Sequence, residues 1–210
     1  FRTAILWRLG ELPRVQQSCL NTYDSDHTRI CPDTLGTGDA HETECSVGPM
    51  MNLRHSAMCE VWCRIADQTR ALVRREVLVP EFYTAKHGHA WLDTLFTGTP
   101  DIHEIFGDIS IRNPRASRYQ PMAQREGGYC ADKSAREKKT RYPDSGGRKC
   151  TPLITETWGR MNAAAESLLI TVASACARDQ RRRGRTPGNC LTTWRCQLDG
   201  TLHYWITLMI

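Results

Sequence analysis

The sequence has no long hydrophobic run, which argues against an ordinary transmembrane helix. Its longest apolar stretch, WITLMI at 205–210, is far shorter than the ~20 residues that cross a bilayer. Nucleotide-binding motifs are also missing, since neither a GxxxxGK[ST] loop nor a GxGxxG turn after a strand occurs. The chain has no N-x-S/T sequon, and FRTAILWRLGELPRV at its start lacks the apolar core of a signal peptide. These absences weaken a secreted interpretation without excluding it, so the localisation stays open.

Large aliphatic side chains are absent from residues 112–152. This segment has no Leu, Ile, Val, Phe or Trp, and its eleven basic residues face only four acidic ones. Such a composition buries too little apolar surface to offset the entropy lost on ordering, so it predicts a basic disordered segment or linker. The chain is thereby divided into an α-rich region over 1–111, with a loop over 17–49, and a helix–hairpin unit over 153–210.

Two segments have the apolar periodicity of amphipathic helices. In the first, over 53–79, apolar residues recur at steps of three and four, and Pro80 is expected to end the helix. The second spans 160–182. A shorter helix is expected in TPDIHEIFG at 99–107, which has proline near its start and glycine at its end.

The strongest turn signal is Asp199-Gly200, which predicts a β-hairpin over 191–209. In that hairpin, Trp194 faces one side of the sheet while Leu202 faces the other. This disagreement between turn chemistry and apolar pattern argues against a well-specified fold. The expected fold class is α+β, with two amphipathic helices and a C-terminal hairpin, and the alternative of no stable unique fold stays open.

Basic residues are concentrated in the C-terminal half. The net charge of +5 combines −5 over residues 1–111 with +10 over residues 112–210. A basic surface binds polyanions by charge alone, so non-specific polyanion binding is expected of this half. The candidate contacts are five arginines and three tyrosines that could stack on bases: Arg178, Arg181, Arg182, Arg183, Arg185, Tyr119, Tyr129 and Tyr142. No known nucleic-acid-binding motif accompanies them, and no specific partner is identified.

Ten cysteines make the chain cysteine-rich, and their even number leaves disulfides, free thiols and metal binding open. The best zinc quartet has the spacing H-x3-C-x13-C-x3-C and consists of His41, Cys45, Cys59 and Cys63. The interpretation without metal is that Cys59 and Cys63 are ordinary thiols of a helix. His87 and His89 could hold a metal from a strand, but exposed loop histidines are the preferred interpretation.

One short string has a catalytic pattern. DSGG at 144–147 resembles the nucleophile segment of chymotrypsin-like serine peptidases, and TAKH, which ends at His87, resembles that family's histidine segment. The resemblance implies that Ser145 attacks the substrate, His87 accepts its proton and Asp101 orients the imidazole. Pro143 stands where the family has glycine.

No motif identifies a function, and the preferred interpretation is a random-like chain without an evolved site. We therefore expect no enzyme, no catalytic, cofactor-binding or metal residues, no cofactor and no membrane. The first alternative is a basic nucleic-acid-associated binding module, because the charge distribution favours it. The remote alternative is the peptidase.

Overall fold

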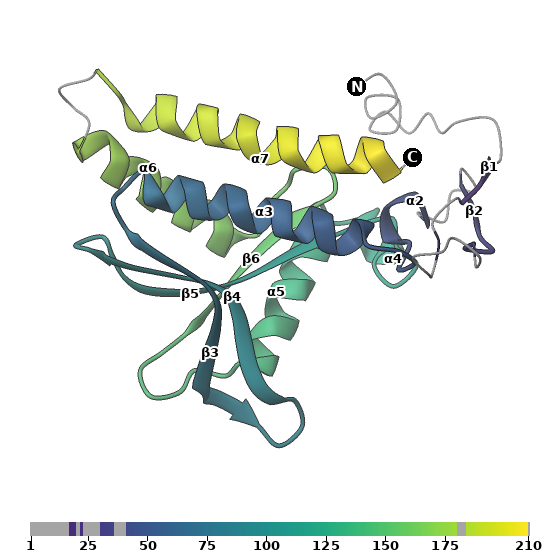
Figure 1. Ribbon diagram of the computed structural model, residues 1–210, viewed down its shortest axis with the longest axis horizontal. Coiled ribbons are helices and arrows are strands. Elements are labelled where there is room, and N and C mark those ends of the chain that lie inside the picture. Colours follow the sequence, from purple (N-terminus) through teal and green to yellow (C-terminus); the bar gives the residue numbers. More distant parts are fainter. Residues whose placement is uncertain (1–16, 20–21, 23–29, 36–40, 180–183, 210) are drawn as a thin grey trace.

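A four-stranded sheet forms the centre of the structure. The computed structural model describes residues 17–19, 22, 30–35, 41–179 and 184–209 (Figure 1). Its helices and strands are, in chain order, β1 (Gln17–Ser18), β2 (Thr34–Leu35), α2 (His41–Glu44), α3 (Met50–Asp67), β3 (Leu72–Thr84), β4 (Gly88–Thr99), β5 (Ile102–Arg112), α4 (Gln120–Ala123), α5 (Tyr129–Arg141), β6 (Cys150–Glu156), α6 (Ala163–Asp179) and α7 (Pro187–Met209). Among these described helices, none combines the length and the apolar character needed to cross a membrane.

Helices cover both faces of this sheet. The strand order is β3-β4-β5-β6, in which β3, β4 and β5 are antiparallel and β6 runs parallel to β5. Leu153 of β6 belongs to the core with α3, α6 and α7, whereas its neighbour Ile154 packs against Ala131 and Ala135 of α5. Since successive strand residues point to opposite faces, α5 lies on the face opposite the other three helices, as Figure 1 also shows. The class α+β is therefore correct, but the expected set of two helices and a hairpin is wrong.

The main core lies between the sheet and the three helices α3, α6 and α7. Trp62 of α3, Leu169 of α6 and Trp194 of α7 are almost completely buried beside Phe96 and Ile109 of the sheet. Burying an aromatic or leucine side chain contributes roughly 1.5–3 kcal/mol relative to exposure, so this layer dominates the stability of the fold.

The helix predicted over 53–79 ends earlier than expected. Thr69 Oγ1 donates to a carbonyl of the last turn, and Arg70 adopts a left-handed φ of 63° that stops the helix. The chain then enters β3, and Pro80 lies within this edge strand, where a missing N–H is tolerated. The short helix predicted over 99–107 is also wrong, because most of that segment belongs to β5.

The C-terminal hairpin predicted over 191–209 is wrong, because the segment forms the long helix α7. Its buried side chains follow one another at steps of four residues: Cys190, Trp194, Leu198 and Leu202. This spacing places them on one face of a helix, which resolves the two-sided pattern that a hairpin would leave. Packing of that face overrides the turn propensity of Asp199-Gly200. The other expected helix, over 160–182, is observed as α6.

Residues 112–152 are folded, so the prediction of a disordered segment or linker is wrong. They contain α4 and α5, and the strands β5 and β6 that enclose them are neighbours in the sheet. Ala116, Tyr119 and Cys130 form a small core, and Tyr142 packs against the ring of Phe82. Small residues and tyrosines thus supply the buried surface that aliphatic side chains usually provide.

The β4–β5 ladder ends at the pair Thr94–Gly107, although both strands extend beyond it. Toward its N-terminus β4 keeps β3 as its partner, while β5 continues beside β6 as far as Arg112. A side chain at position 107 would collide with Thr94 Oγ1 and press on Leu153, so glycine permits the close approach at this last pair. We call the opening beyond Thr94 and Gly107 the fork.

The core predicts a sharp contrast between two adjacent residues of α6. Leu169 is completely buried, whereas Ile170 is 49% exposed. We expect Leu169→Ala to lower the free energy of unfolding by about 2–5 kcal/mol, because it leaves a cavity. The matched control Ile170→Ala should change it by no more than ~0.5 kcal/mol. Urea unfolding followed by circular dichroism measures both, and equal losses would contradict the assignment of this helix face.

Candidate functional site

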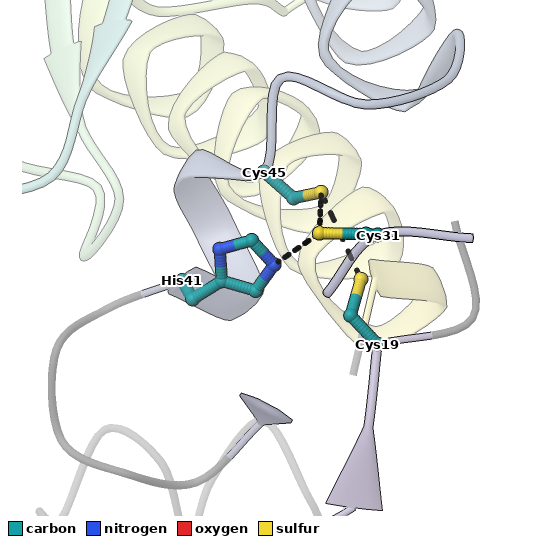
Figure 2. Close-up of side chains that lie close together, drawn as sticks. All are labelled: Cys19, Cys31, His41 and Cys45. Atoms are coloured by element: carbon teal, nitrogen blue, oxygen red, sulfur yellow. Dashed lines mark hydrogen bonds between the residues drawn. The ribbon is translucent and has the colours of Figure 1, made fainter. Parts of the chain in front are cut away.

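Three cysteines and one histidine of the N-terminal segment converge in space (Figure 2). Cys45 Sγ lies 3.7 Å from Cys19 Sγ and 3.9 Å from Cys31 Sγ. Cys31 Sγ in turn lies 3.4 Å from His41 Nε2, and the four ligand atoms all lie within 4.8 Å of one another. A tetrahedral zinc ion with Zn–S bonds of about 2.3 Å holds its sulfur atoms about 3.8 Å apart. The cluster therefore has the spacing of a Cys₃His zinc site.

Short elements bring these ligands together. Cys19 N–H donates to Asp33 O at 2.9 Å, which ties the chain after β1 to the chain before β2. His41 and Cys45 lie at the two ends of α2, and Cys45 N–H donates to His41 O. A single helical turn therefore presents an imidazole and a thiol on the same side.

Asp33 orients the histidine of this cluster. Its Oδ2 atom lies 3.3 Å from His41 Nδ1, while the other ring nitrogen faces Cys31. A carboxylate behind a histidine fixes the tautomer of a zinc ligand in the same way. Burial raises the pKa of the Cys31 thiol, and a bound cation favours the thiolate form by lowering that pKa.

The structure divides the zinc quartet predicted from the sequence. His41 and Cys45 belong to the observed cluster, whereas Cys63 is a buried thiol of α3 and Cys59 lies beside His55 and Asp93 in a second group of side chains that could hold a metal ion. Burial raises the pKa of Cys63 to about 11. The observed spacing, C-x11-C-x9-H-x3-C, contains one close pair rather than two, so the other two ligands gave no recognisable signal.

A second cluster lies at the fork, where two aspartates meet. Asp93 of β4 and Asp108 of β5 are the first residues beyond the last pair of the ladder, and their carboxyl groups influence each other's pKa. Asp93 Oδ2 also accepts a 2.6 Å hydrogen bond from Ile109 N–H. A side chain thus satisfies a backbone donor where the β4–β5 ladder has ended.

Two cationic side chains flank these carboxyl groups. Lys138 Nζ of α5 lies 2.7 Å from Asp108 Oδ2, an ion pair without the angles of a regular hydrogen bond. His55 Nε2 of α3 lies 3.3 Å from Asp93 Oδ2 and 3.2 Å from Ile109 O. Because the strands part at the fork, helices from both faces of the sheet reach the same two carboxyl groups.

The charges at the fork shift the pKa values of its groups in different directions. Burial raises the pKa of Asp108 and outweighs the opposing charge of Lys138. Burial acts on Asp93 in the same direction, but the hydrogen bond and charge of His55 outweigh it and lower the pKa of Asp93. The hydrogen bond to Asp93 raises the pKa of His55 to about 10, so the imidazole is protonated at neutral pH. Paired carboxyl groups with separated pKa values are typical of functional sites.

The structure does not bring the peptidase candidates together. His87 lies in the turn before β4 and Asp101 in the turn after it, so a strand of 12 residues separates them. At ~3.4 Å per residue, that distance is far beyond a hydrogen bond. Ser145 lies in another turn, before β6. His89 contacts the ring of Tyr83 at a centroid distance of 5.4 Å.

Two of the arginines expected to contact nucleic acid form polar contacts within the protein. Arg178 forms an ion pair with Asp101, and Arg185 donates to Gln68 Oε1 at 3.5 Å. Residues 181–183 lie outside the described part of the chain. The tyrosines expected to stack on bases are buried or half-buried: Tyr119, Tyr129 and Tyr142.

Sequence reasoning missed Asp93, Asp108 and Lys138. Each aspartate interrupts an apolar, β-forming run, WLDTLF or FGDISI, and a carboxylate within a buried strand is costly unless it is paired or used. That signal was lost for Asp108 because residues up to 107 were predicted as a helix. Lys138 lies in a charged helix, where its sequence neighbours do not distinguish it.

Comparisons with known proteins leave these two clusters as the functional evidence. No protein-family model matches the chain, and no curated protein matches it either.

The Cys₃His cluster predicts the binding of about one zinc ion per chain. We expect Cys45→Ser to abolish stoichiometric zinc binding and to lower the melting temperature, because it removes one of four ligands. Cys196→Ser is the matched control, since Cys196 is the exposed cysteine, and it should leave both unchanged. Native mass spectrometry and a thermal melt test this, and zinc retention by Cys45→Ser would rule out the site.

Proposed function

We propose that the protein is a divalent-metal-dependent nuclease whose N-terminal segment is stabilised by zinc. The observation that carries the proposal is the convergence of Asp93, Asp108 and Lys138 at the fork, where two strands and a helix hold them in place. A pair of carboxylates with an adjacent ammonium group is suited to bind a metal ion and a phosphate together. The sequence led us to expect no enzyme, and this geometry supports a different conclusion.

The oxygen atoms at the fork suit magnesium. Mg²⁺ takes six oxygen ligands, and proteins commonly supply one or two carboxylates and leave the other places to water and substrate phosphate. Asp93 Oδ2 and Ile109 O share one cationic neighbour, the imidazole of His55, and Asp108 adjoins them. Positive charge is therefore already favoured at this position, and we expect Mg²⁺ to compete with the imidazolium for these oxygens.

Hydrolysis of a phosphodiester needs an activated water and stabilisation of the charge on phosphorus. A bound metal ion supplies both by lowering the pKa of water and polarising the phosphoryl oxygen. Lys138, held by Asp108, adds a fixed positive charge beside the reacting phosphate. The water oxygen forms the new P–O bond and releases a proton to solvent, while the bridging P–O bond breaks and the leaving oxygen takes up a proton from solvent.

Exposed aromatic side chains on the β3–β4 hairpin favour nucleic acid over a small phosphoester. Trp91 is 61% exposed and precedes Asp93 by two residues on β4. Tyr83, on the neighbouring strand β3, is 56% exposed and contacts His89. Bases stack on such rings with about 1–3 kcal/mol each, and the positive net charge of +5 attracts a phosphate backbone.

The second candidate is a nucleic-acid-binding module without catalysis, in which the imidazolium of His55 permanently fills the fork. His55 Nε2 contacts both Asp93 Oδ2 and Ile109 O, and this double contact favours the second candidate. Binding of nucleic acid without cleavage in Mg²⁺ would support this candidate and contradict the nuclease.

The nuclease proposal predicts a strong effect of Asp108→Asn. The substitution removes a metal ligand, and a loss of several kcal/mol of transition-state stabilisation lowers the rate of Mg²⁺-dependent cleavage by at least about a hundredfold. Asp144→Asn is the control, because Asp144 is exposed and pairs only with Lys149 among the described residues. Cleavage of a labelled oligonucleotide measures both, and full activity of Asp108→Asn would contradict the proposal.

Two adjacent lysines of α5 give a second test. Lys138 is largely buried against Asp108, whereas Lys139 is exposed. We expect Lys138→Gln to lower the cleavage rate by about tenfold or more, since it removes the charge beside the phosphate. Lys139→Gln should retain the wild-type rate within about twofold. The rates are compared at saturating Mg²⁺, and equal rates for the two variants would argue against a role for Lys138.

A further inference from the structure

A pocket of about 240 Å³ lies where α2, the helix that carries His41 of the Cys₃His cluster, meets the end of β5. It is much larger than the ~10–15 Å³ that one water molecule occupies on a comparable measure. Its walls come from α2, α3, the end of β5 and the chain that follows β5. The polar side chains that line it are mainly Thr43, Arg54, Arg112, Asn113, Ser117 and Arg118.

Three arginines give this pocket a positive lining, opposed by the single carboxylate of Glu44. Each arginine is held by a contact of its own. Arg54 is buried and donates to Thr43 O at 3.0 Å. Arg112 Nε donates to Ser134 Oγ at 2.9 Å, and the Arg118 guanidinium lies 4.4 Å from the centre of the Tyr119 ring.

Fixed guanidinium groups are suited to bind phosphate. Their planar donors match the oxygen atoms of a phosphate, and a group that is already held in place loses little further entropy on binding. Burial lowers the pKa of Arg54 to about 10, so it keeps its charge at neutral pH. An anion in the pocket would supply the opposite charge to the Arg54 guanidinium, which is largely desolvated by burial.

We propose that this pocket binds a backbone phosphate of the nucleic-acid strand that is cleaved at the fork. The inference rests on the proposed nuclease function for the identity of the strand. Arg112 follows Asp108 by four residues on β5, so the pocket and the fork lie roughly 13 Å apart along that strand. The bound phosphate therefore belongs to a nucleotide a short distance along the strand from the cleaved bond.

The experiment measures binding separately from cleavage. Fluorescence anisotropy follows a labelled single-stranded DNA of about 20 nucleotides at increasing NaCl, with zinc-loaded protein and no added Mg²⁺. We expect Arg118→Gln to reduce the slope of log K against log [NaCl] by about one, because one phosphate contact is lost. Arg125→Gln is the control, since Arg125 is an exposed arginine that does not line the pocket, and it should keep the wild-type slope.

Three outcomes would overturn the inference or separate it from the nuclease. Equal slopes for Arg118→Gln and Arg125→Gln overturn it. Calorimetric binding of inorganic pyrophosphate that Arg118→Gln abolishes, with an unchanged DNA slope, overturns it too, because the pocket then takes a free anion. If the wild-type protein fails to cleave DNA in Mg²⁺ but the slope still depends on Arg118, the nuclease is wrong and the phosphate pocket stands.

Discussion

The hydrogen bond from Ile109 N–H to Asp93 holds the fork open and fixes its chemistry at the same time. Where a strand leaves its neighbour, a buried N–H loses its partner, and a buried amide without a partner costs about 1–3 kcal/mol. Asp93 satisfies that donor with a carboxylate oxygen at 2.6 Å. The same contact holds its carboxyl group against Asp108 on the next strand. A break in the sheet thus becomes a place where two acids are positioned by backbone rather than by flexible side chains alone.

Charge balance explains why these acids are tolerated inside the fold. Two carboxyl groups removed from water would repel each other, and one of them would take up a proton. A cation from each side of the sheet balances the charge of these carboxyl groups: His55 from α3 pairs with Asp93, and Lys138 from α5 pairs with Asp108. The pKa of Asp93 is lowered and that of Asp108 is raised, so Asp93 is the more readily ionised carboxyl group of the pair.

The sequence was informative where apolar periodicity alone decides the structure, and it failed where distant contacts decide. The apolar residues around Met58 and Leu169 correctly predicted helices, because their burial follows the helical repeat. The hairpin predicted from Asp199-Gly200 was wrong because a local turn preference of about 1 kcal/mol is smaller than the free energy gained by burying Trp194 in the same segment. Spacing along the chain identified only His41 and Cys45 of the Cys₃His cluster and no residue of the fork, because the members of both clusters come from separate strands, helices and loops.

The buried guanidinium of Arg54 links α2, which carries His41 of the Cys₃His cluster, to α3, and it also lines the pocket of the three arginines. Its acceptor, Thr43 O, lies in α2, a helix of only four residues. So short a helix does not persist by itself, and its geometry depends on the ligands at its two ends, His41 and Cys45. A metal ion held by His41 and Cys45 would fix both ends of this turn, and with it the carbonyl that Arg54 contacts in the arginine-lined pocket.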